Sequence, residues 1–157
     1  MKKSELRSII REMLREELAI NKTDIQQNNT HQIIGCYLKD NINYMKKDNC
    51  LPKLPLLWFI DEIEDTKTDS RIVFSHHKLP VGVQVWCKYY NDDTNLKNCY
   101  YEFTCEIRID NNTQMCNKET VAPFPYDFIR RIFKLVDEFD YTLNNSKSKA
   151  DVFKSFT

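Results

Sequence analysis

Acidic side chains gather at two places in the sequence and offer a candidate for metal chemistry. One run covers residues 61–65, and the other is the pair Asp92 and Asp93. Carboxylates are the oxygen ligands that Mg²⁺ prefers, and several of them close together could support metal-assisted hydrolysis. Acidic turns and the solvated face of a sheet produce the same pattern, so a small metal-dependent nuclease or hydrolase is kept as the alternative hypothesis. Its candidate catalytic residues are Asp61, Glu64, Asp92 and Glu106.

Six cysteines invite a zinc site, but their spacing argues against one. The chain contains no Cys-x-x-Cys pair, and the closest two are Cys99 and Cys105. On one strand these two would lie about 20 Å apart at roughly 3.3 Å per residue, too far to share a metal ion. We therefore expect no metal site, and we interpret the cysteines as reduced thiols, with Cys87 and Cys105 buried as small apolar residues.

A nucleophilic pair of cysteine and histidine is a further possibility. His76 and His77 are adjacent on a predicted strand and so face opposite ways. One of them could meet Cys50 or Cys116 across the fold. Nothing in the spacing favours this geometry over ordinary surface or core histidines.

The composition excludes several classes of function. Lysine and arginine together number 23, as do aspartate and glutamate, so bulk charge attracts neither nucleic acid nor an anionic membrane. With only two glycines, the sequence lacks a glycine-rich phosphate loop, and we expect no cofactor. The charged N-terminus and the absence of an apolar run of 18 residues indicate no signal peptide and no membrane span. We therefore expect an intracellular location.

The centre of the chain reads as a β-hairpin over residues 81–110. Both halves alternate apolar and polar residues, as strands with one buried face do, and a polar, Asn- and Asp-rich loop separates them. If both apolar faces look the same way, the numbers of facing residues must have an even sum. A sum of 190 also sets Lys88 against Glu102 and Val85 against Cys105, so we prefer that register, although neighbouring even sums remain open.

The polar face of this hairpin carries large aromatic residues. Trp86, Tyr90 and Tyr100 would share it with basic side chains, which is the composition of a base-stacking platform. Glu102 and Glu106 lie on the same face and would repel phosphate, so we do not expect nucleic acid there. A covering helix or a protein partner bound at Trp86 is the preferred interpretation.

Residues 1–20 contain the clearest amphipathic helix, and a polar linker over 21–32 follows it. The polar side separates arginines from glutamates, an arrangement that can select a partner. Packing on its own domain and docking onto a partner or a second copy of the chain are both consistent with the pattern. The apolar seam consists of Leu6, Ile9, Ile10, Met13, Leu14 and Leu18.

The remaining segments predict one α+β domain over residues 33–143. It comprises N-terminal helices, including one at 31–47 with Thr30 as N-cap, a mainly antiparallel sheet of about four strands, and a C-terminal helix at 126–143 packed on the sheet. The polar segment 144–157 is interpreted as a flexible tail.

One resemblance bears on function. The segment Ser4–Leu18, with its Arg, Glu and Leu composition, resembles leader helices at the start of many small tailed-phage proteins. That resemblance implies a phage-encoded protein, located in the host cytoplasm or in the virion, without implying an activity. The preferred hypothesis is a non-enzymatic structural or interaction protein, such as a phage virion or assembly component. An inhibitor of a host enzyme would share these features and is a further alternative.

Overall fold

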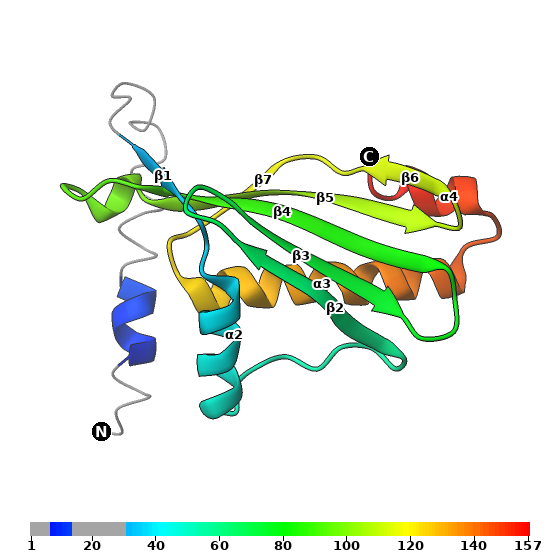
Figure 1. The fold of residues 1–157 in the computed structure, drawn as a ribbon, viewed down its shortest axis with the longest axis horizontal. Helices are drawn as coiled ribbons and strands as arrows, with labels where there is room; N and C mark the ends of the chain where they lie inside the picture. The colour runs from blue at the N-terminus through cyan, green and yellow to red at the C-terminus, as the bar shows by residue number, and fades with distance from the viewer. Residues whose placement is uncertain (1–6, 14–30) are drawn as a thin grey trace.

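The computed structural model describes residues 7–13 and 31–157, and an antiparallel sheet dominates the described part (Figure 1). Five consecutive strands form a meander in the order β2-β3-β4-β5-β6. Two short strands extend it, β1 on β4 and β7 on β5. The α+β class is confirmed, whereas the expected four strands are seven in this part of the chain. The strands are β1 (Gln32–Ile34), β2 (Trp58–Asp65), β3 (Ser70–His76), β4 (Val81–Asn91), β5 (Tyr100–Ile109), β6 (Asn112–Met115) and β7 (Glu119–Val121).

The predicted register of the central hairpin is confirmed. Val81 faces Ile109, Val85 faces Cys105 and Lys88 faces Glu102 along the β4–β5 pair. Side chains alternate between the faces, so one face is apolar and buried over residues 81–87 of β4 and 101–109 of β5. That face forms the floor of the hydrophobic core, with Val81, Val83, Val85, Cys87, Tyr101, Phe103, Cys105, Ile107 and Ile109.

The long helix α3 (Pro125–Asn145) covers this apolar face, as the sequence predicted (Figure 1). Pro125 occupies its first turn, where the missing backbone N–H costs nothing. Seven side chains of the helix are buried and complete the core. They are Phe128, Ile129, Ile132, Phe133, Leu135, Val136 and Phe139.

The segment 31–47, predicted as one helix, divides into β1 and the helix α2 (Leu38–Lys47). Thr30, its predicted N-cap, lies outside the described residues. The start of α2 is instead capped from a distant strand end. The carboxylate of Asp65 accepts hydrogen bonds from the backbone N–H groups of Leu38 at 2.9 Å and Lys39 at 3.0 Å. Such a carboxylate satisfies free helix donors and complements the positive end of the helix dipole.

The segment 144–157, predicted as a flexible tail, contains a further helix, α4 (Lys149–Lys154). Ser148 caps it, because its hydroxyl oxygen accepts a hydrogen bond from the Asp151 N–H at 3.2 Å. Val152 is only 2% exposed and belongs to the core, while Phe156 packs edge-on to Phe139. The burial of these apolar residues holds the segment against the domain.

A disulfide joins Cys105 and Cys116, so the prediction that all six cysteines are reduced is wrong. The β5–β6 register ends with Glu106 opposite Met115, and the disulfide joins the next two residues, where the Cys116 N–H donates to the Cys105 carbonyl at 2.8 Å. Cys36, Cys50, Cys87 and Cys99 are free thiols. The burial predicted for Cys87 is confirmed, and a hydrogen bond with Cys36 together with burial raises the pKa of the Cys87 thiol.

Candidate functional site

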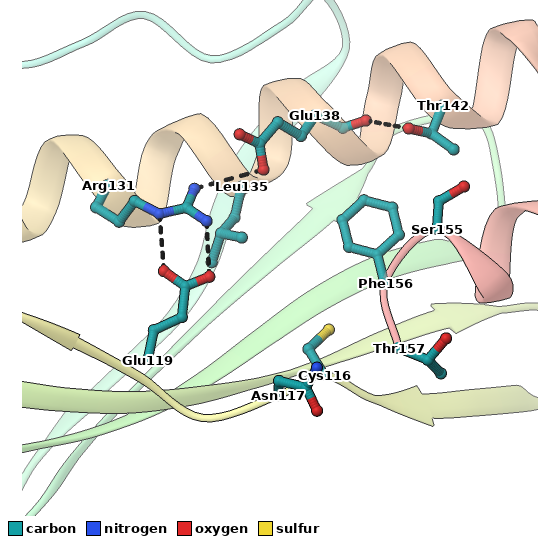
Figure 2. A pocket seen from close by; sticks show the side chains of 10 residues that line it. All are labelled: Cys116, Asn117, Glu119, Arg131, Leu135, Glu138, Thr142, Ser155, Phe156 and Thr157. Carbon is teal, nitrogen blue, oxygen red and sulfur yellow. Dashed lines mark hydrogen bonds and ion pairs between the residues drawn. The ribbon is translucent and has the colours of Figure 1, made fainter.

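A pocket of about 390 Å³ opens where α3, the segment after β6 and the end of the chain meet (Figure 2). α3 contributes side chains at i, i+4, i+7 and i+11, which share one helix face. Residues 116, 117 and 119 form the opposite wall, and residues 155–157 close one end. The helical residues are Arg131, Leu135, Glu138 and Thr142.

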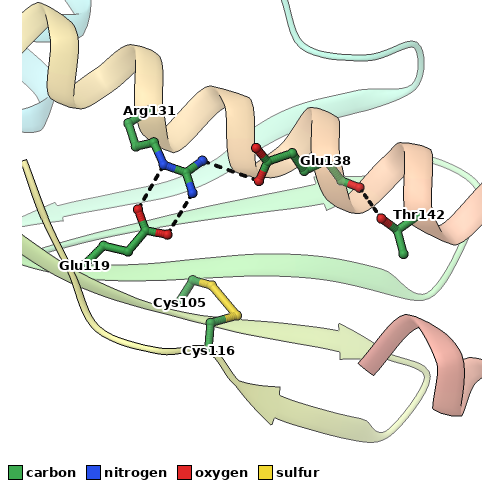
Figure 3. Close-up of polar contacts among 6 residues, drawn as sticks. All are labelled: Cys105, Cys116, Glu119, Arg131, Glu138 and Thr142. Carbon is green, nitrogen blue, oxygen red and sulfur yellow. Dashed lines mark hydrogen bonds and ion pairs between the residues drawn. A yellow bond between two sulfur atoms is a disulfide. The ribbon is translucent and has the colours of Figure 1, made fainter. Parts of the chain in front are cut away.

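Arg131 organises the charges of this pocket (Figure 3). Its Nε donates to Glu119 at 2.9 Å and its Nη2 donates to the other oxygen of the same carboxylate at 2.7 Å. Its Nη1 donates to Glu138 at 3.4 Å. Burial alone would lower the pKa of Arg131, but the two carboxylates raise it. One guanidinium against two carboxylates leaves a net negative charge on the lining, so the pocket does not suit an anion.

The hydroxyl groups of the pocket are engaged with the backbone. Thr142 donates to the Glu138 carbonyl at 2.7 Å, and Ser155 donates to the Asp151 carbonyl at 3.1 Å. Cys116 lines the wall with its sulfur in the disulfide. The proposed Cys116–histidine nucleophile is therefore wrong for this oxidised form, because a disulfide sulfur is not a nucleophile.

The four carboxylates of the hydrolase hypothesis lie on two strands and a loop and are not brought together. Asp61 accepts a hydrogen bond from Ser75 at 3.0 Å, and Glu64 pairs with Arg71 at 3.2 Å. Asp92 follows β4, and Glu106 faces Gln84 in the middle of the sheet. Across residues 7–13 and 31–157, no three His, Cys, Asp or Glu side chains form a group that could hold a metal ion.

Asp92 instead organises the loop between β4 and β5. Its carboxylate accepts hydrogen bonds from the Thr94 hydroxyl at 2.6 Å, the Asn98 amide at 2.8 Å and the Thr94 N–H at 2.9 Å. These bonds favour the ionised form and lower the pKa of Asp92 to about 2.

We expect Asp92 to make stability depend on pH in the acid range. The pKa is lower in the folded state, so the ionised carboxylate stabilises the protein above about pH 4, and that contribution is lost as the pH falls towards 2. Urea midpoints measured at pH 5, 3 and 2 should fall less steeply for Asp92→Asn than for the parent. Asp93→Asn, a change at the exposed neighbour, is the control and should keep the parental slope.

The outer face of the sheet, opposite α3, carries the aromatic residues predicted for it. Trp86 is half-buried between its neighbours Arg71 and Thr104. Further along, Tyr90 and Tyr100 stack with their ring centroids 4.7 Å apart, and His31 packs edge-on to both. The sequence predicted the two tyrosines on this face but placed His31 in a helix.

The N-terminal helix is described over residues 7–13 only, and it leaves its apolar side open. Ile9, Ile10 and Met13 are 45%, 47% and 63% exposed. The Arg11 guanidinium lies 5.4 Å from the centroid of the Tyr126 ring, which places the helix beside the start of α3. Leu6, Leu14 and Leu18, the rest of the predicted seam, lie outside the described residues.

No protein-family model, curated protein or solved structure matches this chain. Within the part of the chain that the structure describes, no helix is both long and apolar enough to cross a membrane.

Proposed function

We propose that this protein is a non-enzymatic interaction protein that binds a protein partner, or a second copy of itself, through its N-terminal helix. The observation that carries this proposal is the exposure of Ile9, Ile10 and Met13 on one side of residues 7–13. Burying a large apolar side chain contributes roughly 1.5–3 kcal/mol, so three adjacent ones are a substantial source of binding energy. The domain itself has a closed core of its own and does not bury these side chains.

The contact of Arg11 with Tyr126 supports the same proposal. It attaches the helix through its polar side and turns the apolar side away from the domain. A cation over an aromatic ring contributes about 0.5–1 kcal/mol at an exposed site and about 2 kcal/mol when desolvated, so a partner could replace this one contact at small cost. Trp86 and the stacked pair Tyr90–Tyr100 offer a second aromatic contact surface on the outer face of the sheet.

The resemblance of residues 4–18 to phage leader helices extends the proposal to a biological setting. A phage virion or assembly component would use such a helix to join a larger structure, inside the host cell or in the particle. An inhibitor of a host enzyme would use the same surface, and the partner would then be that enzyme.

Ile10→Glu tests the proposal, with Ser8→Glu as the matched control. Both introduce one negative charge on the same helical segment, and both parent residues are exposed. Light scattering should show that the mass of any assembly falls for Ile10→Glu and not for Ser8→Glu. For a monomeric chain, the readout is a captured protein that is lost with Ile10→Glu and retained with Ser8→Glu.

Deletion of residues 1–24 separates docking from folding. The shortened chain should unfold cooperatively with a Tm only a few degrees lower, because the core of the domain contains none of residues 7–13, the part of the helix that the structure describes. A large fall in Tm with unchanged mass and unchanged capture would show that the helix belongs to the domain, and the proposal would fail.

A further inference from the structure

The Cys105–Cys116 disulfide (Figure 3) joins a residue that lines the pocket to one that does not. Cys105 is 2% exposed and belongs to the core beneath α3. Cys116 is half-buried and lines the pocket. Figure 2 shows its sulfur pointing into the pocket on the side of Phe156. A reagent entering from solvent therefore meets the sulfur of Cys116 and not that of Cys105.

We propose that this disulfide is a site of reversible thiol–disulfide exchange, at which a small thiol entering the pocket attacks the Sγ of Cys116. The attacking thiolate forms a mixed disulfide with Cys116 as the Cys105–Cys116 bond breaks. Cys105 leaves as a thiolate and takes up a proton, because its apolar surroundings disfavour the charge. The second thiol of a dithiol then displaces Cys116 and closes the reductant into a cyclic disulfide, so two electrons pass to the protein.

Reduction of the disulfide should loosen the pocket wall formed by the segment after β6. β6 has only four residues, most of them exposed, and it pairs with β5 alone. The disulfide links the chain just after β6 to the centre of the sheet, and it closes a ring over residues 105–116. Opening that ring restores conformational freedom to the segment that carries Asn117 and Glu119 into the pocket. The pocket is thus shaped by the oxidised form and loosened by reduction.

The charges of the pocket set the preferred thiol. Glu119 and Glu138 outweigh Arg131, so the approach to Cys116 is slightly negative. A thiol that carries an amine should react faster per thiolate than one that carries a sulfonate, and the difference should shrink at high salt. We therefore infer that the natural reagent is a neutral or cationic thiol, or a dithiol, in preference to an anionic one.

Mass spectrometry on the folded full-length chain tests the site directly. The purified protein, alkylated without reductant, should show the 105–116 crosslink. Cysteamine should then give a mixed disulfide on Cys116 in at least tenfold excess over Cys105. Dithiothreitol without denaturant should reduce the bond, and hydrogen exchange over residues 112–118 should rise and return on reoxidation. An adduct mainly on Cys105, reduction only in denaturant, unchanged exchange, or no crosslink would each overturn the proposal.

A matched pair of variants tests the preference of the pocket for cationic over anionic thiols. Cysteamine and 2-mercaptoethanesulfonate are compared as rate constants per thiolate, and we expect a several-fold advantage for cysteamine in the parent. Glu138→Gln should reduce that advantage, since it removes a charge from the pocket while keeping an acceptor for Arg131. Glu62→Gln, the same change on β2 outside the pocket lining, should leave it unaltered. Equal effects of the two variants would place the attack outside the pocket.

Discussion

Replacing Phe128 with Ala should lower the free energy of unfolding by about 3–5 kcal/mol, the range for removing a large aromatic side chain from a packed core. Phe128 is 1% exposed in the first turns of α3. Its ring stacks on that of Tyr101, with the two centroids 4.4 Å apart and an angle of 4° between the planes. The centroid of the Phe103 ring lies 5.7 Å from that of Phe128. The substitution removes the contacts that attach the start of α3 to β5 and leaves a cavity that neighbouring strands cannot fill.

Tyr141→Ala is the control for this prediction. Tyr141 lies on the same helix and loses a ring of similar size, but it is 70% exposed. Its replacement should change the free energy of unfolding by no more than about 0.5 kcal/mol. Urea unfolding followed by circular dichroism measures both variants. Because Ala is a better helix former than either aromatic residue, helix propensity cannot account for a loss, and similar losses for the two would mean that the contacts of Phe128 with the sheet contribute no more than an exposed ring does.

The central hairpin and α3 could be predicted because their patterns are long and local. Ten residue pairs join β4 to β5, and an error of one residue would turn every apolar side chain outward. That energetic cost is why parity, with the pairs Lys88–Glu102 and Val85–Cys105, was enough to prefer the register that the structure has. The wide apolar band of α3 must likewise be removed from water, and the apolar face of the sheet is the surface that can bury it.

The short strands and the start of α2 could not be predicted because their causes are distant in sequence. β1 has three residues, two of them exposed, and exists only because it pairs with residues 89–91 at the end of β4. Tyr37, the residue before α2, has a positive φ of 50°, and Asp65, whose carboxylate caps the helix, is 27 residues from Leu38. No local propensity encodes either contact. The helix α4 within the segment 144–157 was not predicted either, because the burial of Val152 in the core depends on tertiary contacts.

The sequence contained two signals for the pocket that our sequence analysis did not use. The two-residue turn Asp110–Asn111 joins β5 to β6, with a positive φ of 54° at Asp110. Asparagine and aspartate tolerate such angles, and a turn placed there sets Cys105 opposite Cys116. The Arg131–Glu138 stripe of α3 was readable as one helix face. Its partner Glu119, on β7, was not, because the position of that strand depends on tertiary pairing with β5.

Replacing Gly35 with Ala should destabilise the protein by about 3 kcal/mol or more, at the upper end of the cost of overpacking. Gly35 is buried between β1 and α2 and donates its N–H to the Lys67 carbonyl at 2.9 Å. A Cβ at this position would overlap the carbonyl oxygen of Thr66 and would lie 3.2 Å from that of Asp69. Both obstacles are backbone atoms of the β2–β3 turn, so relief requires moving the turn or detaching the segment that leads into α2.

Gly82→Ala is the control for this prediction, because Gly35 and Gly82 are the two glycines of the chain. A Cβ at Gly82 would meet the Phe74 carbonyl at 3.1 Å and the Arg108 side chain at 3.4 Å. The arginine can move and the strand needs to shift only slightly, so we expect a loss of about 1 kcal/mol or less. Urea midpoints rank the two variants, and hydrogen exchange over residues 32–47 should rise selectively for Gly35→Ala. If Gly35→Ala proved as stable as Gly82→Ala, the close approach of β1 to the β2–β3 turn would not be a requirement of the fold.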